Sequence, residues 1–204
     1  MNEVFDYFKK IFNNNGFRLF MIGSSSRDYL LGKKILDYDF VTDATPEDTK
    51  KFLKCDQTFE RYGSLKVKYN GYNVDIVTFR IEGSYKDYRH PSFIKFVKSI
   101  EEDYVRRDFT INSIYIDENY NILDPTNLGV SDLKNRILRL IGDKEQRLEE
   151  DPLRIIRGER FLKEYGLEYD EETKKAFDNK RYLIKKLNKS KVVEEISKGE
   201  KYEI

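Results

Sequence analysis

The length of 204 residues fits one domain, or one domain with an extension, and is sufficient to bury a hydrophobic core. A formal net charge of +1 excludes a global basic field, so a nucleic-acid partner would have to bind through local patches. Aromatic residues make up 14% of the chain, which argues against intrinsic disorder even though 37% of the residues are charged.

The chain has one cysteine, Cys55, which excludes an intramolecular disulfide and fits a reducing compartment. The first residues lack the apolar core of a signal peptide, and no run of about 18 apolar residues predicts a membrane helix. We therefore expect a cytoplasmic protein with no membrane contact.

The first expected element is an amphipathic helix that ends before Gly16. Its apolar residues recur at helical spacing: Val4, Phe5, Phe8, Ile11 and Phe12. Residues 17–22 then read as a strand, a short helix follows that stops at Gly32, and residues 36–41 form a second strand. The pair Thr45-Pro46 marks another helix start, with threonine as N-cap and proline at the first helical position.

The segments SLKVKY (64–69) and YNVDIVTF (72–79) alternate in polarity and are joined by Asn70-Gly71. Asn-Gly between two alternating runs is the strongest short signal for a β-hairpin. Residues 109–116 are a further candidate strand. From about Lys144 onward helical periodicity dominates, which predicts an α/β head over residues 1–140 and a helical segment over residues 141–204.

Two acids, Asp37 and Asp39, alternate with apolar residues in the second expected strand, so both carboxylates point to one face. Their Cα atoms should lie roughly 7 Å apart. Two carboxylates at this spacing can bind a pair of Mg²⁺ ions for phosphoryl transfer. A solvent-facing strand edge that happens to carry two acids is the alternative.

A glycine-serine pair, Gly23-Ser24, precedes these acids by one short helix. Glycine allows close backbone approach, and free N–H groups at a helix start suit a triphosphate. Arg27 adds a planar guanidinium fork. This order of turn, short helix and D-x-D strand resembles the DNA polymerase β-like nucleotidyltransferase superfamily.

That resemblance implies an α/β (α+β) head with a mixed or antiparallel sheet and two Mg²⁺ ions bound by Asp37 and Asp39. It also implies a triphosphate site at Gly23, Ser24 and Arg27. A third carboxylate is expected on a neighbouring strand, and Asp75 is the candidate. An exposed acid of the hairpin is the alternative interpretation of Asp75.

Four motifs stand in the order typical of the class II CCA-adding enzyme and bacterial poly(A) polymerase family, which the chain resembles from about residue 17 to residue 198. They are RDYLLG with DYDFVTDATPE (27–47), VRRDFTINSI (105–114), LRLIGD (138–143) and EEDPLRIIRGERF (149–161). The resemblance implies template-independent addition of CCA, or of the terminal A, to tRNA 3′ ends from CTP and ATP. It makes residues 1–140 a catalytic head and residues 141–204 a base-recognising helical neck.

The second of these motifs places a cation, a carboxylate and an amide together as Arg107, Asp108 and Asn112. Asp108 can accept hydrogen bonds from ribose hydroxyls, which would favour ribonucleotides. The resemblance assigns ribose recognition to this motif. A structural ion pair between Arg107 and a nearby acid is the alternative.

The fourth motif places Asp151 and Arg154 three residues apart, as neighbours on one helix face that Arg157 continues. A carboxylate acceptor and a guanidinium donor can together pair with the edge of cytosine or of adenine. The resemblance implies that these residues select CTP and then ATP. By spacing alone, a surface salt bridge explains the pair better.

Residues 78–96 have few regularly spaced apolar residues and are expected to be a mobile loop. The stretch resembles the family's flexible loop, with Asp87 and Arg89 in the expected places, which is implicated in the switch from C to A addition. LNKSKVVEEISK (187–198) weakly resembles a fifth motif, with Lys191 and Glu194 at its charged positions.

The chain departs from the family in reading GSSS at the triphosphate turn and in lacking the body and tail domains that grip tRNA. Either the sequence is a piece of a longer protein, or a separate chain or a homo-oligomer supplies that grip, or the enzyme is naturally this short. Three alternatives stay open: a poly(A) polymerase acting on RNA 3′ ends, a non-catalytic head–neck subunit that binds nucleotide or RNA, and nucleotidyl transfer to a small molecule.

Overall fold

The computed structural model describes residues 2–85 and 91–200. The chain divides into two compact units, each built from several separate segments of the sequence. The first unit contains residues 1–81, 94–106 and 112–127, and the second contains residues 82–93, 107–111 and 128–204. A functional boundary near residue 140 stays a prediction.

A six-stranded mixed sheet forms the centre of the first unit, which confirms the predicted fold class. Its strand order is β3-β4-β2-β1-β7-β8, with β2 and β4 parallel and the other neighbours antiparallel. The strands are β1 (Leu19–Met21), β2 (Tyr38–Thr42), β3 (Ser64–Tyr69), β4 (Tyr72–Thr78), β7 (Tyr115–Ile116) and β8 (Ile122–Leu123). A separate two-stranded sheet pairs β5 (Arg80–Glu82) with β6 (Ile94–Phe96).

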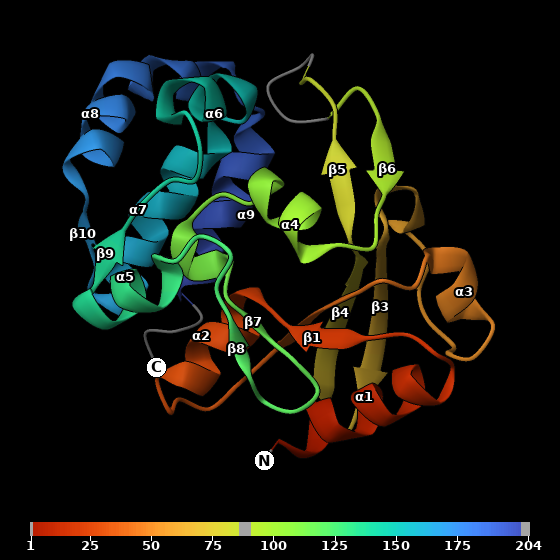
Figure 1. The fold of residues 1–204 in the computed structure, drawn as a ribbon. Coiled ribbons are helices and arrows are strands. Elements are labelled where there is room, and N and C mark those ends of the chain that lie inside the picture. Colours follow the sequence, from red (N-terminus) through yellow and green to blue (C-terminus); the bar gives the residue numbers. More distant parts are fainter. Residues whose placement is uncertain (1, 86–90, 201–204) are drawn as a thin grey trace. The chain divides into compact units, whose positions relative to one another are not determined.

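The predicted N-terminal helix is α1 (Glu3–Asn14), which Figure 1 shows beside the sheet. Its aromatic stripe packs on one face of this sheet. Asn2 caps the helix by accepting the Phe5 N–H at 3.0 Å. The Phe5 and Phe8 rings are fully buried, with centroids 5.5 and 5.7 Å from the ring of Phe40 on β2. Each buried ring stabilises the fold by roughly 1.5–3 kcal/mol, which fixes this face of β2 as the interior one.

The local predictions around the sheet are confirmed. The helix α2 (Gly23–Leu30) follows the glycine-serine turn, and α3 (Pro46–Lys50) begins with a capping box at Thr45. The hairpin of β3 and β4 turns at Asn70 and Gly71, both with positive φ, as a type I′ turn requires. The first unit also holds α4 (Ile100–Asp103) and the 3₁₀ turns η1 (Glu60–Tyr62) and η2 (Tyr104–Arg106).

The second face of the sheet carries a smaller core in which Val41 packs with Phe20, Phe79 and Tyr115. Side chains alternate along β2, so Asp39 and Val41 share this face while Tyr38 and Phe40 face α1. Asp37 directly precedes β2, and its contact with Asn73 of β4 keeps it on the face of Asp39. Three side chains on this face, which we call the acid face, become more exposed toward the start of the strand: Val41 is buried, Asp39 is partly buried and Asp37 is exposed. The acids therefore lie where this core ends.

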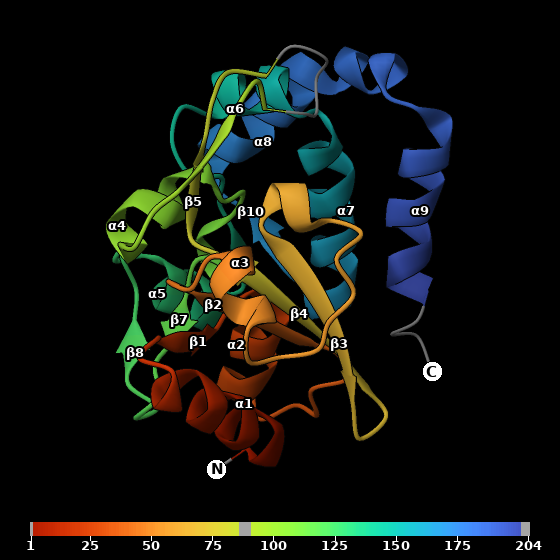
Figure 2. The ribbon, with the colours of Figure 1, turned by 90° about the vertical axis from the view of Figure 1, so that its right-hand side faces the viewer.

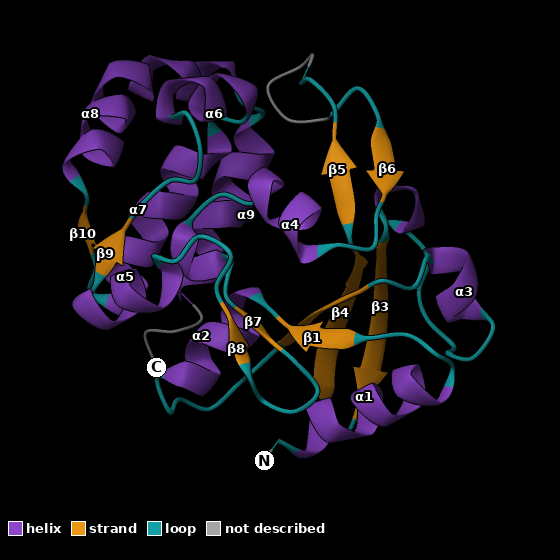
Figure 3. Cartoon of the chain, in the orientation of Figure 1, coloured by secondary structure: helices purple, strands orange, loops and turns teal. Residues whose placement is uncertain are grey.

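Helices dominate the second unit, as predicted for the C-terminal part of the chain (Figure 3). They are α5 (Gly129–Asn135), α6 (Lys144–Glu150), α7 (Leu153–Tyr165), α8 (Glu171–Lys180), η4 (Arg181–Lys186) and α9 (Lys189–Glu200). Figure 2 shows α9 running beside α7. A Cβ built at Gly158 of α7 would lie 2.7 Å from the Phe177 ring of α8, so glycine is needed for this close helix packing.

Three predicted features differ in the structure. Residues 109–116 form the 3₁₀ turn η3 (Thr110–Asn112) and only the short strand β7, because the ring of Phe109 packs instead against Phe161 in the second unit. The described ends of the 78–96 stretch form β5 and β6 rather than a loop. Two short parallel strands, β9 (Ile137–Leu138) and β10 (Glu168–Tyr169), interrupt the helical segment.

Among the described residues, no helix combines the length and the apolar character that crossing a membrane requires.

Candidate active site

The parallel pairing of β2 and β4 places two of the three predicted carboxylates side by side. Asp39 and Asp75 are register partners, so their side chains leave the sheet on the same face from adjacent strands. Asp37 lies two residues earlier on that face, and its Oδ1 accepts a hydrogen bond from the Asn73 amide at 2.8 Å. The structure thus places the three acids on one face, around the start of β2 and the middle of β4.

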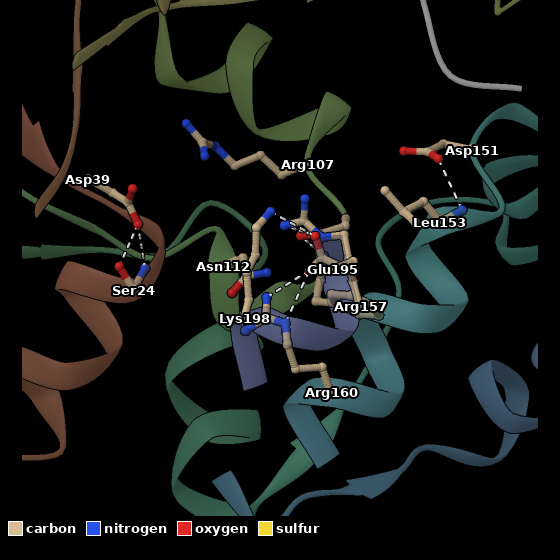
Figure 4. A network of polar contacts seen from close by, with 12 residues as sticks. Ser24, Asp39, Arg107, Asn112, Asp151, Leu153, Arg157, Arg160, Glu195 and Lys198 are labelled. Carbon is tan, nitrogen blue, oxygen red and sulfur yellow. Dashed lines mark hydrogen bonds and ion pairs between the residues drawn. The ribbon is translucent and has the colours of Figure 1, made fainter. Parts of the chain in front are cut away.

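The turn before α2 contacts the middle acid directly. The Asp39 Oδ2 atom accepts the Ser24 backbone N–H at 3.0 Å and the Ser24 hydroxyl at 2.5 Å (Figure 4). Gly23 has a φ of +61°, and a Cβ there would lie 3.0 Å from the same carboxylate oxygen. Glycine is required here both for the backbone conformation and for the close approach.

The two serines that depart from the family pattern have local structural roles. The Ser25 hydroxyl accepts the Asp39 backbone N–H at 2.7 Å, and the Ser26 hydroxyl donates to the Gly23 carbonyl at 3.2 Å. Both side chains are fully buried. The GSSS turn therefore holds β2 and the start of α2 together through hydroxyl groups.

The guanidinium of Arg27 is buried and donates through Nη1 to the Oδ1 atom of Asn112. Asn112 itself is almost fully buried. Arg27 thus links the first motif to the second inside the first unit. A contact between Arg27 and a triphosphate, and one between Asn112 and a ribose, stay predictions.

The electrostatics of the acid face distinguish Asp75. Burial raises the pKa of the Asp75 carboxyl above its usual range, and the neighbouring Asp39 acts in the same direction. The ammonium of Lys66, 3.6 Å from Asp75 Oδ1, pulls that pKa down but does not reverse the shift. A carboxylate with a raised pKa is a better proton acceptor than an ordinary surface acid.

The predicted ribose residue, Asp108, lies in the second unit and forms an ion pair with Arg157 at 2.8 Å. Its other oxygen accepts the Phe109 backbone N–H at 2.8 Å. The Arg107 carbonyl accepts a hydrogen bond from Arg147 at 3.0 Å. Sequence reasoning did not anticipate that a candidate ribose residue and a candidate base residue would pair with each other.

The predicted base-reading residues do not share one helix. The chain leaves α6 at Asp151, and α7 begins at Leu153, whose N–H donates to Asp151 Oδ1 at 3.1 Å (Figure 4). The reason is Pro152, which disfavours helical backbone at the residue before it. The expectation of one continuous helix face is therefore wrong, and Asp151 instead lies at the break between two helices.

Arg154, in the first turn of α7, is almost fully buried. Its guanidinium donates to the Arg147 carbonyl and lies 3.6 Å from Glu150, and the Tyr85 ring centroid is 5.8 Å away. Burial raises the pKa of the Tyr85 hydroxyl, and the nearby Glu82 carboxylate adds to that shift. The predicted loop residues Asp87 and Arg89 lie outside the described residues.

Residues 19–139 match the family described as the poly(A) polymerase head domain. The chain belongs to this family. A CCA-adding enzyme of Lactobacillus helveticus is 41% identical to this head-domain protein over 184 residues, which are 90% of the chain and 46% of the relative.

Solved structures of CCA-adding enzymes resemble this chain as well. The Bacillus stearothermophilus CCA-adding enzyme in complex with CTP superimposes with a TM-score of 0.86 at 31% identity, covering 98% of this chain and 49% of that one. A tRNA nucleotidyltransferase complexed with a primer tRNA and an incoming ATP analog gives a TM-score of 0.74 at 26% identity, covering 93% and 54%. The head-domain protein spans about half the length of the curated relatives it matches.

The donor set of the head-domain protein suits a hard divalent cation. Asp37, Asp39 and Asp75 offer carboxylate oxygens, the ligands that Mg²⁺ prefers, from adjacent positions on one sheet face. Within residues 2–85 and 91–200, no three acidic, histidine or cysteine side chains already converge as a metal site. Ser24 engages only one of the two Asp39 oxygens, so the other oxygen of that carboxylate can coordinate a cation.

The head-domain protein also contains a buried charged cluster that sequence reasoning did not anticipate. The weakly recognised fifth motif put its acid at Glu194, but Glu194 forms an exposed ion pair with Lys191 at 2.7 Å. Its neighbour Glu195 is the buried acid, and it pairs with Arg160 at 3.0 Å and with Lys198 at 2.9 Å (Figure 4). Hydrophobic periodicity could not find it, because α9 turns a charged face inward.

Proposed function

We propose that this chain is the head-and-neck portion of a tRNA nucleotidyltransferase that adds CCA, or its terminal A, to tRNA 3′ ends from CTP and ATP. The observation that carries the proposal is the register pairing of Asp39 with Asp75 beside the Gly23-Ser24 turn. In that arrangement, carboxylates on two adjacent strands lie beside the backbone N–H groups at the start of α2. The relatives named above as CCA-adding enzymes support the same reaction.

In the proposed reaction the terminal 3′ hydroxyl oxygen of the RNA forms a bond to the α-phosphorus of the nucleotide. The bond between that phosphorus and the bridging oxygen to the β-phosphate breaks, and pyrophosphate leaves. Asp75 accepts the proton of the attacking hydroxyl, a role that its raised pKa favours. Gly23, Ser24 and Arg27 orient the triphosphate through backbone N–H, hydroxyl and guanidinium donors, for which the two Ser24 donors exchange Asp39 for a phosphate oxygen.

Two Mg²⁺ ions are proposed at Asp37 and Asp39, where they would lower the pKa of the attacking hydroxyl and neutralise the departing pyrophosphate. The alternation of these acids along one strand face and the exposure of Asp37 support this assignment. Asn73, which donates to Asp37, holds that carboxylate on the acid face.

The second and fourth sequence motifs are proposed to read the nucleotide. Arg107, Asp108 and Asn112 recognise the ribose, and Asp151, Arg154 and Arg157 recognise the base. The ion pair of Arg157 with Asp108 supports joint positioning of the ribose and base residues. In this assignment residues 1–140 act as the catalytic head and residues 141–204 as the neck, and Asp87 and Arg89 act in the switch from C to A.

The direct test is incubation of the purified chain with tRNA that lacks its terminal CCA, together with Mg²⁺ and CTP, ATP or both. Ordered addition of C, C and A is expected. Asp39→Asn should reduce incorporation by at least about a hundredfold, because it removes a negative charge that the proposed metal ions require. Asp178→Asn, which changes an exposed acid on α8, is the matched control and should leave the rate unchanged.

A poly(A) polymerase is the second candidate, favoured by the family description itself. Extended A addition to unrelated RNA, without use of CTP, would select it. Nucleotide binding without incorporation on any RNA acceptor would instead indicate a non-catalytic head–neck subunit. If tRNA is extended only weakly, RNA binding should be measured at increasing protein concentration, which would reveal tRNA binding that depends on a second copy of the chain. Adding a separate body or tail chain would reveal tRNA binding that depends on such a chain.

A further inference from the structure

Lysines on the edge strand β3 extend the row that Asp39 of β2 and Asp75 of β4 form across the sheet. In the antiparallel β3–β4 pair, Lys66 is the register partner of Asp75, and Lys68 is the register partner of Asn73. Register partners leave a sheet on the same face, so both lysines stand on the face that carries the acids. Asp39, Asp75 and Lys66 thus form one row across three adjacent strands.

The two lysines stand at the exposed border of this face. Both are exposed, and the Lys66 side chain retains 48% of its accessible surface. An ion pair this exposed contributes little to stability, so folding does not require the contact of Lys66 with Asp75. Two cations beside three carboxylates are more simply explained by an anionic partner that has to approach those acids.

An exposed aromatic ring lies beside the same lysine. Phe59 retains 47% of its accessible surface, and the Lys66 Nζ atom lies 5.7 Å from its ring centroid. The backbone fixes the segment that carries the ring. Asp56 and Lys66 exchange two backbone hydrogen bonds of 2.8 and 3.1 Å, and the Ser64 N–H donates to the Phe59 carbonyl at 3.3 Å.

The anchoring also extends to side chains. The Asp56 carboxylate accepts the Thr58 N–H at 2.8 Å and the Thr58 hydroxyl at 2.6 Å, which shapes the turn leading into Phe59. A large apolar ring held by this turn at the surface gains little from burial. It is suited instead to stacking against a planar partner.

We propose that Phe59, Lys66 and Lys68 form a strip that binds the single-stranded 3′ end of the RNA primer. The lysines contact successive backbone phosphates, and Phe59 stacks on an unpaired base. Two lysines that alternate along a strand lie roughly 7 Å apart, which is comparable to the spacing of neighbouring phosphates in an extended RNA strand. Lys66 of the strip lies in register beside Asp75, where the proposed function places the 3′ hydroxyl, and the inference rests on that function.

The combination of cations and a stacking ring fits single-stranded nucleic acid better than a free nucleotide. A free nucleotide carries its phosphates in one cluster, whereas the strip distributes its charges along a strand edge. Proteins that bind single strands without reading sequence pair a basic track with aromatic rings in this manner. The strip therefore predicts affinity for the primer and not for CTP or ATP.

The test measures binding of a short, fluorescently labelled single-stranded RNA by anisotropy across a salt series, and the KM values for tRNA lacking CCA and for CTP. Lys68→Ala is the main variant, because Lys68 pairs in register with Asn73 and not with the acid Asp75. It should raise the KM for tRNA and leave the KM for CTP unchanged. The slope of log affinity against log salt should become less negative by about 0.7 for each phosphate that the variant no longer neutralises.

Two further variants separate charge from stacking. Phe59→Leu keeps an apolar side chain but removes the ring, and it should weaken RNA binding about tenfold with an unchanged salt slope. Lys66→Arg should retain RNA affinity where Lys66→Ala loses it. Lys10→Ala, which removes an exposed lysine from α1 on the opposite side of the sheet, should change neither quantity.

The outcomes distinguish the strip from the proposed function. If wild-type protein extends tRNA while Lys68→Ala and Phe59→Leu keep the wild-type KM and salt slope, the strip is refuted and the function stands. If wild-type protein neither binds nor extends any RNA, both fall. Selective loss of RNA affinity with normal CTP kinetics supports both.

Discussion

Replacing Gly23 by alanine should damage the acid face more than it damages the fold. The residue has a φ of +61°, and a non-glycine residue in this conformation costs about 1–2 kcal/mol. The new Cβ would also lie 3.0 Å from Asp39 Oδ2, so the carboxylate has to move by a few tenths of an ångström. That movement disturbs two hydrogen bonds from Ser24 to the same oxygen, each worth about 1.5–3 kcal/mol because the acceptor is charged.

Gly32→Ala is the matched control for this substitution. Gly32 ends the same short segment with a φ of +66°, and a Cβ there would meet nothing within 4 Å. The Gly32→Ala variant should therefore lose only about 1–2 kcal/mol of unfolding free energy, from backbone strain. Gly23→Ala should lose about 2–4 kcal/mol in total, since it adds the disturbance of the Asp39 hydrogen bonds.

Urea unfolding of both variants measures these losses, and nucleotide incorporation into tRNA lacking CCA measures the effect on Asp39. Incorporation should fall at least about tenfold more in Gly23→Ala than in Gly32→Ala, because small displacements of a reacting group are costly. Equal losses of stability and of incorporation in the two variants would refute the reasoning, since the contact with Asp39 would then have no consequence.

Three further predictions concern buried polar groups. Glu195→Gln should cost about 1.5–3 kcal/mol of unfolding free energy and Glu194→Gln at most about 1 kcal/mol, since only the first weakens charge-assisted hydrogen bonds at a buried carboxylate. Burial alone would raise the pKa of Glu195, but Arg157, Lys198 and Arg160 outweigh burial and lower that pKa. The stability due to Glu195 should therefore be complete above about pH 4.3 and be lost as the pH falls below it. A Glu195→Gln loss of stability in urea melts that stayed the same at acid pH would contradict this. Tyr115→Phe should cost about 1.5–3 kcal/mol in the same melts, because it removes a 2.7 Å hydrogen bond to a fully buried Asp103 carboxylate, and a neutral effect would argue against that bond. Asp108→Ala should reduce the preference for CTP over dCTP in single-nucleotide incorporation, and an unchanged ratio would remove Asp108 from ribose recognition.

The elements that depend on local signals were predicted well. The stripe of phenylalanines, the capping box and the Asn70-Gly71 turn each specify their structure through neighbouring residues, so α1, α3 and the β3–β4 hairpin follow from the sequence. The alternation that placed Asp37 and Asp39 on one face of a strand is of the same local kind.

Long-range pairings were beyond that reasoning. The sequence suggested that Asp75 lies on a neighbouring strand, but only the parallel pairing of β2 and β4 makes it the register partner of Asp39. The pairing of Asp108 with Arg157 likewise joins residues almost fifty positions apart. No periodicity within one element contains such information.

Other predictions failed where a second physical effect outweighed the sequence pattern on which they were based. Helical spacing suggested one face for Asp151 and Arg154, but Pro152 ends the regular backbone between them. Hydrophobic patterning failed for α9, where Val193 and Ile196 are exposed and Glu195 is buried among cations. The buried charge is stable there because its partners satisfy it, a condition that composition does not reveal.

The exchange of segments between the two units limits how the protein can be divided. Residues 107–111 belong to the second unit although residues on both sides belong to the first, and Phe109 packs against Phe161 and Phe177 there. A fragment cut after residue 127 would carry Phe109 away from these rings and expose both halves of the cluster. The units are therefore expected to be inherited and recombined as one genetic block, and fragment complementation should succeed only when both pieces are present during folding.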